Sequence, residues 1–337
     1  MRIRRCGIFL LIMGLLFSLA GCREKEINKY SCDFFAMDTY ITCQVLTDDQ
    51  ALAKAGLAGV EQAFLKIDRL TNRFDQSSEL SAVNRNAGIA PVKVSSDVIA
   101  IVGTSLDWAE KTDGAFNILI GSAMDCWGFG TDHPHLPAEA ELAEAMKKTD
   151  YHRIVLDPEK STIFLPEKGM VLDLGGIAKG YATDQAVKAL QKLGIRNALI
   201  NAGGNVYAMG SRVDGTAWQV GVQDPRNPKG IKAVLAGLDV AMVSSGDYQR
   251  YFEVDGIRYH HILDPASGYP ARASAGTTVI MKSSAVADIL STALFVKGPV
   301  EGIKLAESLN EVDAVMIITG DGVRFGTKDL NDYLVKK

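Results

Sequence analysis

Residues 173–210 read DLGGIAKGYATDQAVKALQKLGIRNALINAGGNVYAMG. Here a strand is expected to end in an acidic residue, a glycine pair turns the chain, and a helix is predicted over 177–193. Two short strands, NALIN and VYAMG, follow the helix and are separated by a second glycine pair. Short strands joined by turns and mixed with helices indicate an α+β fold rather than a doubly wound parallel sheet.

The flanking sequence repeats this mixture of helices and largely antiparallel strands. Helices are predicted over 51–74, from the cap at Ser95-Ser96-Asp97 to Trp108, over 137–148, over 283–295 and once more before a terminal hairpin at Asp321-Gly322. Strands are predicted over 32–46 with a turn at Met37-Asp38, over 153–157 and 161–165, over 218–223, around the Asp255-Gly256 turn and over 277–282. No repeat or linker divides these elements, which predicts a single domain.

Composition and charge exclude several classes of protein. The chain has 337 residues, of which 47% are hydrophobic and 23% charged, as in ordinary globular proteins. Its 36 Lys and Arg residues against 40 Asp and Glu residues give a net charge of −4. This balance argues against a dedicated nucleic-acid-binding protein, because such proteins carry an excess of positive charge.

The N-terminus has the pattern of an export signal. Arginines at positions 2, 4 and 5 precede an apolar run over 7–17, which is shorter than the ~20 residues of a spanning helix. The run ends in Leu19-Ala20-Gly21-Cys22, which matches the bacterial lipoprotein box. We therefore predict a signal peptide over 1–21, a lipidated tether over 22–31 beginning at Cys22, and the functional domain over 32–337. An ordinary signal peptide or an uncleaved anchor is the alternative. The prediction places the protein outside the cytoplasm, on the surface of a bacterial membrane.

The remaining cysteines indicate no zinc or redox site. Cys32, Cys43 and Cys126 form no CxxC pair. Cys32 and Cys43 could form a disulfide in an oxidising compartment, although two buried thiols are the favoured interpretation.

Two glycine-rich segments could hold an anionic ligand. Backbone N–H groups at the helix start after Asp173-Leu174-Gly175-Gly176, with Lys179 nearby, suit a phosphate, although such a segment taken alone is more often a plain connection. The second segment, NAGGN over 201–205, permits close approach of backbone to a ligand but also fits a tight turn. There is no Walker motif and no GxGxxG in a βαβ unit, which argues against a P-loop NTPase and a Rossmann site.

Two further segments carry polar side chains in suggestive positions. Adjacent histidines at 260 and 261 precede the turn-like Asp264-Pro265-Ala266-Ser267-Gly268 and are either functional or solvent-facing. Asp288 and Thr292 are four residues apart, so their oxygens share one face of a helix whose other residues are small or apolar. Such hard oxygen ligands suit Mg²⁺, whereas the alternative is an ordinary polar stripe.

Together these segments resemble the ApbE family of FAD:protein FMN transferases. The resemblance runs from about residue 35 to 325 and rests on Met37-Asp38-Thr39, DLGGIAKGYATD (173–184), NAGGN (201–205), HILDPASG (261–268) and ADILSTALF (287–295). It implies a compact ApbE-like, T-fold-like domain that binds FAD and Mg²⁺, cleaves the FAD diphosphate and transfers FMN to a threonine of a target flavoprotein, releasing AMP.

The resemblance also implies roles for individual residues. Those expected around FAD are Met37, Phe74, Ala115, Phe116, Asn117, Asp173 and Lys179. The expected metal ligands are the carbonyl of Gly176 together with Asp288 and Thr292. His261 is expected near the reacting phosphate, either as the general base that deprotonates the threonine or as a group that orients the diphosphate.

Two alternatives to flavin transfer stay open at this point. FAD hydrolysis to FMN and AMP would use the same metal and phosphate site, with water in place of threonine. A lipid-anchored flavin-binding protein without catalysis is disfavoured, because storage of flavin needs no metal site. The expected acceptor, from the family alone, is a subunit of a membrane redox complex that carries covalent FMN.

Overall fold

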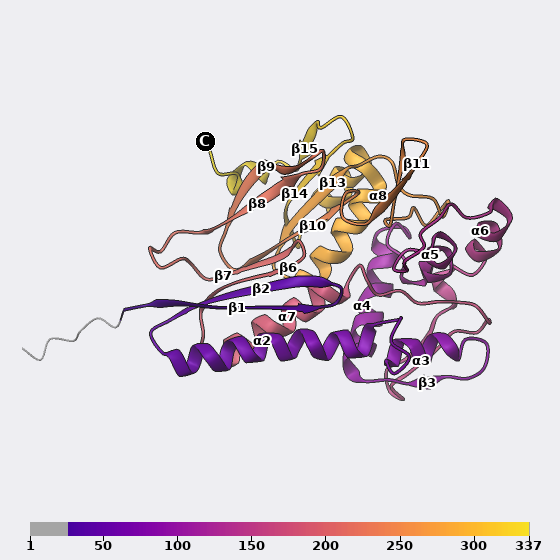
Figure 1. The fold of residues 1–337 in the computed structure, drawn as a ribbon, viewed down its shortest axis with the longest axis horizontal. Helices are drawn as coiled ribbons and strands as arrows, with labels where there is room; N and C mark the ends of the chain where they lie inside the picture. The colour runs from indigo at the N-terminus through magenta and orange to yellow at the C-terminus, as the bar shows by residue number, and fades with distance from the viewer. Residues whose placement is uncertain (1–25, 337) are drawn as a thin grey trace, which may run out of the picture.

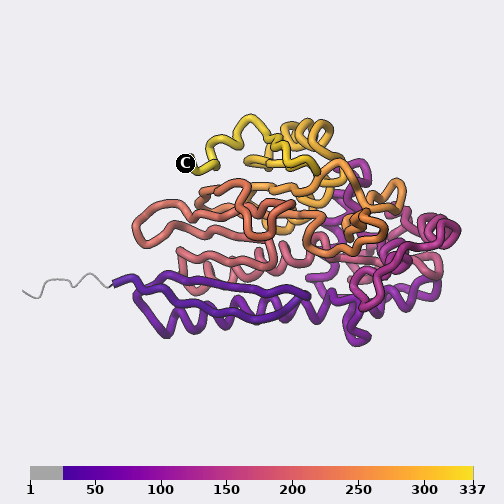
Figure 2. The backbone as a smooth tube through the Cα atoms, turned by 45° about the horizontal axis from the view of Figure 1, so that its top comes forward, coloured from indigo at the N-terminus to yellow at the C-terminus, as the bar shows by residue number. Residues whose placement is uncertain are grey.

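The computed structural model describes residues 26–336, which form an α+β domain around an eight-stranded sheet (Figure 1). The strand order is β1-β2-β6-β7-β10-β13-β14-β15, and the neighbouring strands are antiparallel. These strands are β1 (Asn28–Ala36), β2 (Thr39–Thr47), β6 (Asn197–Ala202), β7 (Asn205–Met209), β10 (Val240–Gly246), β13 (Gly276–Met281), β14 (Val312–Ile318) and β15 (Arg324–Gly326). The N-terminal hairpin and the C-terminal strands therefore lie at opposite edges, the indigo and yellow ends in Figure 2.

Helices cover one face of this sheet. The long helices are α2 (Gln50–Thr71), α7 (Ala178–Lys192) and α8 (Ser284–Ser308). Alternate residues of each strand point toward them, so that Ala241 and Val243 of β10 join the helix-side core while Met242 between them points to the other face. Phe64 and Ile67 of α2 are fully buried in the helix-side core.

A β-hairpin covers part of the opposite face. It consists of β8 (Trp218–Asp224) and β9 (Asn227–Gly237), and α9 (Leu330–Tyr333) packs beside it. Trp218 and Leu235 of the hairpin form a second core with Met242 of the sheet. The sheet is thus sandwiched between helices on one side and a hairpin on the other.

The remaining elements form the part of the molecule on the right in Figure 1. They are α3 (Glu79–Arg85), β3 (Val92–Lys93), α4 (Ser96–Lys111), η1 (Ile118–Ile120), α5 (Gly121–Trp127), α6 (Glu139–Met146), η2 (Tyr151–Arg153), β4 (Val155–Asp157), β5 (Thr162–Phe164), β11 (Tyr251–Val254) and β12 (Ile257–His260). Among the helices of residues 26–336, none has the length and apolar character needed to cross a bilayer.

The predicted α+β class, largely antiparallel pairing and single domain are confirmed. The turn at Met37-Asp38, the Ser95 cap and the hairpin at Asp255-Gly256 all occur as predicted. The predicted strand before Asp173 is wrong. Asp173 N–H donates to Ile118 O at 2.7 Å, and Ile118 belongs to η1, a helical turn that offers no strand to pair with.

The last two predicted helices are the two halves of α8, which is broken at Gly298 (φ +75°, ψ −177°) before Pro299. One predicted boundary differs from the structure. β1 begins at Asn28, so Asn28 to Ser31 belong to the sheet rather than to the tether. The predicted signal peptide and Cys22 lie outside the described residues.

Candidate active site

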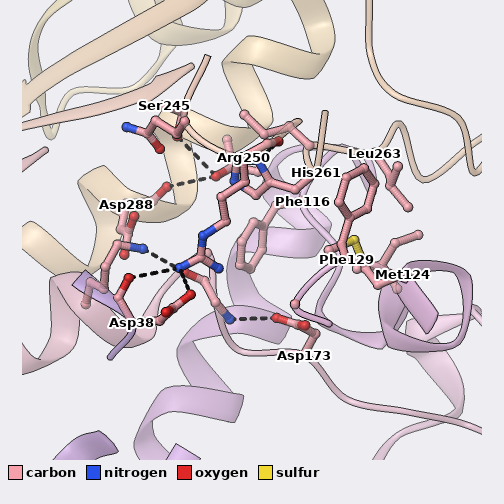
Figure 3. Close-up of a pocket in the computed structure, with 18 of the residues that line it drawn as sticks. Asp38, Phe116, Met124, Phe129, Asp173, Ser245, Arg250, His261, Leu263 and Asp288 are labelled. Atoms are coloured by element: carbon pink, nitrogen blue, oxygen red, sulfur yellow. Dashed lines mark hydrogen bonds and ion pairs between the residues drawn. The ribbon is translucent and has the colours of Figure 1, made fainter. Parts of the chain in front are cut away.

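A cavity of about 430 Å³ brings together segments that are far apart in the sequence (Figure 3). The turn between β1 and β2, the loop before α7, the β6–β7 turn, the segment after β10 and the start of α8 all contribute to its wall. The predicted residues that line it are Phe74, Ala115, Phe116, Asn117, Asp173, Gly176, Lys179, His261, Asp288 and Thr292.

One end of the cavity carries hard oxygen atoms. Asp288 is 3% exposed, and its Oδ2 accepts a hydrogen bond of 3.0 Å from Gly180 N–H. Thr292 lies one helical turn further along α8, and its hydroxyl donates to the carbonyl of Asp288 at 3.3 Å. A Cβ on Gly176 would lie 2.9 Å from the ring of Phe116 and 3.6 Å from Thr292 Oγ1, so the backbone at this point passes close to Thr292 because the residue is glycine.

This donor set fits Mg²⁺. A carboxylate, a hydroxyl and a backbone carbonyl are oxygen ligands, and Mg²⁺ commonly takes one or two carboxylates and completes its shell with water and substrate phosphates. Residues 26–336 contain no group of three or more His, Cys, Asp or Glu side chains that could hold a metal alone. A carboxylate, a hydroxyl and a carbonyl leave part of an octahedral shell open, so the chemistry of this donor set fits Mg²⁺ with further oxygen ligands.

Packing between two helix starts fixes the position of Asp288. The Asp184 carboxylate of α7 accepts hydrogen bonds from Ser284 N–H at 2.8 Å and Ala285 N–H at 3.0 Å, which caps α8. Burial raises the pKa of Asp184, and these hydrogen bonds oppose the rise. A Cβ on Gly180 would overlap the carbonyl oxygen of Ser284, so only glycine permits α7 to approach α8 this closely.

Cationic groups lie in the same cavity. Lys179 Nζ donates to Gly175 O at 3.1 Å, and Arg250 forms an ion pair of 2.7 Å with Asp38 at the turn between β1 and β2. Asp173 accepts from Gly175 N–H at 2.8 Å and pairs with Arg73 at 3.2 Å, so this carboxylate holds the glycine loop in place. Lys179 and Arg250 are therefore cationic groups in the cavity wall that an anionic ligand could contact.

The two adjacent histidines have different environments. His260 is 2% exposed; its Nε2 donates to Ala271 O at 2.8 Å and burial lowers its pKa to about 4, so it is a structural residue. His261 lies in the cavity wall, and its Nδ1 is 3.3 Å from Arg250 O. A carbonyl can only accept, so Nδ1 carries the hydrogen and Nε2 has a free lone pair. Burial, together with the charges of Arg250, His260 and Lys179, lowers the pKa of His261 to about 3 and keeps its imidazole neutral.

The other end of the cavity is apolar, as Phe116, Met124, Phe129 and Leu263 show in Figure 3. Phe74 lies at the mouth with 54% of its surface exposed, and its ring packs against Gly130, where a Cβ would lie 2.6 Å away. A cavity with aromatic surface at one end and cations with oxygen ligands at the other suits a ligand that carries both a planar ring and phosphate.

Comparison with known proteins decides the family. The model of the ApbE family matches residues 37–316. This chain belongs to the ApbE family. A protein of Treponema pallidum named FAD:protein FMN transferase is 33% identical over 340 residues, which cover 95% of this chain and 92% of the relative. A protein of Haemophilus influenzae with the same name is 32% identical over 97% of this chain and 96% of its own.

Solved structures of ApbE proteins share the fold. The ApbE protein of Thermotoga maritima superposes with a TM-score of 0.84 at 30% identity, covering 92% of this chain and all of that chain (100%). The flavin transferase ApbE of Vibrio cholerae gives a TM-score of 0.82 at 26% identity, with the same coverage.

Two of the residues predicted to bind FAD need comment. Met37 does not line the cavity in the structure; its side chain packs partly buried against the core, its N–H donates to Asp68, and the next residues, Asp38 and Thr39, face the ligand space instead. The side-chain amide of Asn117 is engaged by the protein, because it donates to Thr149 O and accepts from Leu119 N–H.

Several residues of the ApbE cavity were not predicted individually. Arg250 and Ser245 belong to no local motif, and only the fold brings them to the cavity. Asn205 also lines the cavity; it is 1% exposed and its Nδ2 has no hydrogen-bond partner. It is the last residue of NAGGN, so the motif indicated the segment, although the glycines rather than the asparagine were singled out.

Proposed function

We propose that this protein is a Mg²⁺-dependent FAD:protein FMN transferase. In the reaction a threonine hydroxyl of an acceptor protein attacks the phosphorus of the FMN half of FAD. The bond from that phosphorus to the bridging oxygen breaks, AMP leaves, and FMN remains attached through a phosphoester. The observation that carries the proposal is one cavity with aromatic surface at one end and Lys179, Arg250, Asp288 and Thr292 at the other.

The chain's own residues account for binding and charge. Lys179 and Arg250 place positive charge where a diphosphate would lie, and fixed charges of this kind stabilise the extra negative charge that develops during phosphoryl transfer. Asp288, Thr292 and the carbonyl of Gly176 would hold Mg²⁺. When bound, the ion would neutralise the diphosphate oxygens and orient them.

His261 is the proposed general base. Its neutral imidazole presents a free Nε2, which can accept the proton that the threonine hydroxyl loses. A pKa of about 3 is low for a base; burial is its largest cause, and the charges of Arg250, His260 and Lys179 add to it. A bound diphosphate would neutralise these cations and raise the proton affinity of His261 at the moment when a base is needed.

The test is incubation of residues 22–337 with FAD and Mg²⁺, with and without an FMN-accepting subunit of a bacterial membrane redox complex. Mass spectrometry would follow the acceptor, and chromatography would follow FAD, FMN and AMP. We expect an FMN adduct on threonine with an equal amount of AMP. Free FMN and AMP without an adduct would indicate FAD hydrolysis instead, and intact FAD in both reactions would leave only flavin binding.

The role of His261 can be tested separately. His261→Gln should lower the transfer rate by roughly 10²–10⁴-fold, the usual contribution of a positioned general base, while FAD affinity changes little. A rate within threefold of the native protein would show that another group takes the proton.

We further propose that the protein is a lipoprotein anchored through Cys22 outside the cytoplasm, on the basis of the sequence at 1–22. Mass spectrometry of the N-terminal peptide should find acylated Cys22, and Cys22→Ser should release the protein from the membrane fraction. An unacylated mature N-terminus would contradict the anchor and leave the flavin chemistry untouched.

A further inference from the structure

A second groove, of about 500 Å³, adjoins the catalytic cavity. Gly203, Ser244 and Gln249 line both spaces, so the two are neighbours that share a wall. The floor of the groove is the hairpin-side face of the sheet, and Leu235 of β9 also lines the space, so the groove lies between the sheet and the β8–β9 hairpin. This floor is made by alternate residues of four strands: Leu199, Asn201, Val206, Met242 and Thr278.

The wall of the groove is strand β8, from Val220 to Gln223. In the described part of the chain β8 pairs with β9 alone. The other edge of β9 is met by the C-terminal segment, through the Leu235–Leu334 bridge and a hydrogen bond of 2.9 Å from Val335 N–H to Val234 O. The free edge of the hairpin is therefore β8, and a free edge presents N–H and C=O groups to any strand that comes alongside.

The hairpin is held in a fixed position relative to the catalytic cavity. Arg226, in the turn between β8 and β9, forms a two-pronged ion pair with Asp247, with both distances 2.8 Å, and its Nε donates to Gly320 O at 3.2 Å. Asp247 is followed after one residue by Gln249 and Arg250, which line the cavity. The groove is thus a preformed surface rather than a gap beside a mobile hairpin.

The chemistry of the groove favours a peptide over a nucleotide. No Asp, Glu, Lys or Arg lines it; its walls are apolar side chains, amide and hydroxyl groups, and three glycines that leave backbone open, Gly203, Gly204 and Gly221. A diphosphate would find no cation here, whereas Lys179 and Arg250 lie in the adjoining cavity. A polypeptide in extended form can pair with a free strand edge and place alternate side chains in apolar pockets.

We propose that the acceptor protein docks here as an extended segment added to the free edge of β8. Its threonine would reach the catalytic cavity at the end lined by Gly203, Ser244 and Gln249. This inference rests on the proposed flavin-transfer function, because it names the surface that presents the hydroxyl to the diphosphate.

The first test blocks the groove. Val220 is half-buried in its wall, and Val220→Phe keeps a residue that strands favour while filling the space beside the sheet. Val213→Phe is the matched control, because Val213 is 60% exposed and does not line the groove. We expect Val220→Phe to raise the acceptor KM at least tenfold and to leave FAD affinity unchanged.

The second test uses the native protein, so it does not depend on whether a variant folds. An acceptor whose target threonine is replaced by valine can bind without being modified. Hydrogen exchange of the native protein with this acceptor should slow in the peptide covering 218–224 and remain unchanged in the α6 segment. The acceptor is the redox-complex subunit used above, supplemented by a library of threonine-containing peptides.

The outcomes separate this inference from the proposed function. If the native protein labels an acceptor but β8 is not protected and Val220→Phe behaves like Val213→Phe, the docking site is wrong and the transferase stands. If Val220→Phe instead weakens FAD binding, the groove belongs to the nucleotide and the proposal is overturned. If the native protein labels neither the subunit nor any library peptide, the transferase assignment fails and the docking site fails with it.

Discussion

The buried His260 should make the protein sensitive to acid, and the size of this effect follows from its surroundings. Its Nε2 donates to Ala271 O at 2.8 Å and its Nδ1 accepts from Ile262 N–H at 3.3 Å, so both ring nitrogens are committed in the neutral form. A proton added at Nδ1 would replace that acceptor with a donor facing another N–H. Burial accordingly lowers the pKa from 6.5 to about 4.

The sign of the effect follows from proton binding in the two states. Between the folded pKa of about 4 and the unfolded pKa of 6.5, the unfolded chain binds more protons, so the free energy of unfolding falls as the pH falls. The full contribution is about 3 kcal/mol, and about 2 kcal/mol of it is lost between pH 7 and pH 5. His261 has the same sign and adds at most a similar amount, because it is partly exposed in the cavity wall.

The assay is urea unfolding at pH 7 and pH 5 of the native protein, His260→Gln and the control His133→Gln. Glutamine can donate to Ala271 O but does not titrate, and His133 is exposed. We expect the native protein and the control to lose about 2 kcal/mol more than His260→Gln. Equal losses in all three would refute the reasoning. If His260→Gln does not fold, an NMR titration of the native imidazole gives the same pKa directly.

Three further substitutions test the site. Asp288→Asn should lower the transfer rate by roughly 10²–10³-fold and change FAD affinity by no more than a few-fold. The rate would be measured as AMP release at increasing Mg²⁺ concentration. An unchanged Mg²⁺ dependence would show that Asp288 does not bind the metal. Gly180→Ala should destabilise the fold by roughly 1–3 kcal/mol in thermal unfolding, because its Cβ would overlap Ser284 O, and a native melting temperature would disprove this close packing. Asn205→Ala should cost under about 1 kcal/mol of stability, because its Nδ2 has no protein partner, yet weaken FAD binding or acceptor turnover; unchanged kinetics would show that this amide does not meet a ligand.

Local physical chemistry predicted most of the elements but not every partner. The Ser95 side chain accepts a hydrogen bond from Val98 N–H, which is the N-terminal cap of α4 that the sequence predicted. The segment before Asp173 has the apolar pattern of a strand, but which element a segment pairs with depends on distant parts of the chain. The break in α8 at Gly298-Pro299 agrees with the two helices predicted there, since that pair normally ends a helix.

The same limit applies to the site. His261, Asp288 and Lys179 were predicted to share a site only through the family resemblance, because no spacing rule links residues so far apart. Arg250 was not predicted, because it meets its ion-pair partner Asp38, 212 residues earlier in the chain, only in the folded structure. The local pattern did not separate His260 from His261, and only the family resemblance selected His261; burial makes His260 structural, and His261 lines the cavity.

The segment DLGGIAKGYATD explains why one motif predicts a site whose other half lies far along the chain, since Gly180 and Asp288 are 108 residues apart. Asp173 and Lys179 line the cavity, while Gly180 and Asp184 of α7 contact the start of α8 through close packing at Ser284 and hydrogen bonds from its first N–H groups. The Gly180 N–H donates to Asp288 itself, so the motif positions the proposed metal ligand as well as the proposed phosphate ligand. A substitution at Gly180 or Asp184 should therefore lower the transfer rate, although neither residue touches FAD. The rate should fall because Asp288 is displaced and not because a charge is lost. Asp184→Asn, which weakens the cap but leaves the cavity wall unchanged, should lower the apparent Mg²⁺ affinity more than the FAD affinity, and equal losses of both would argue against this division.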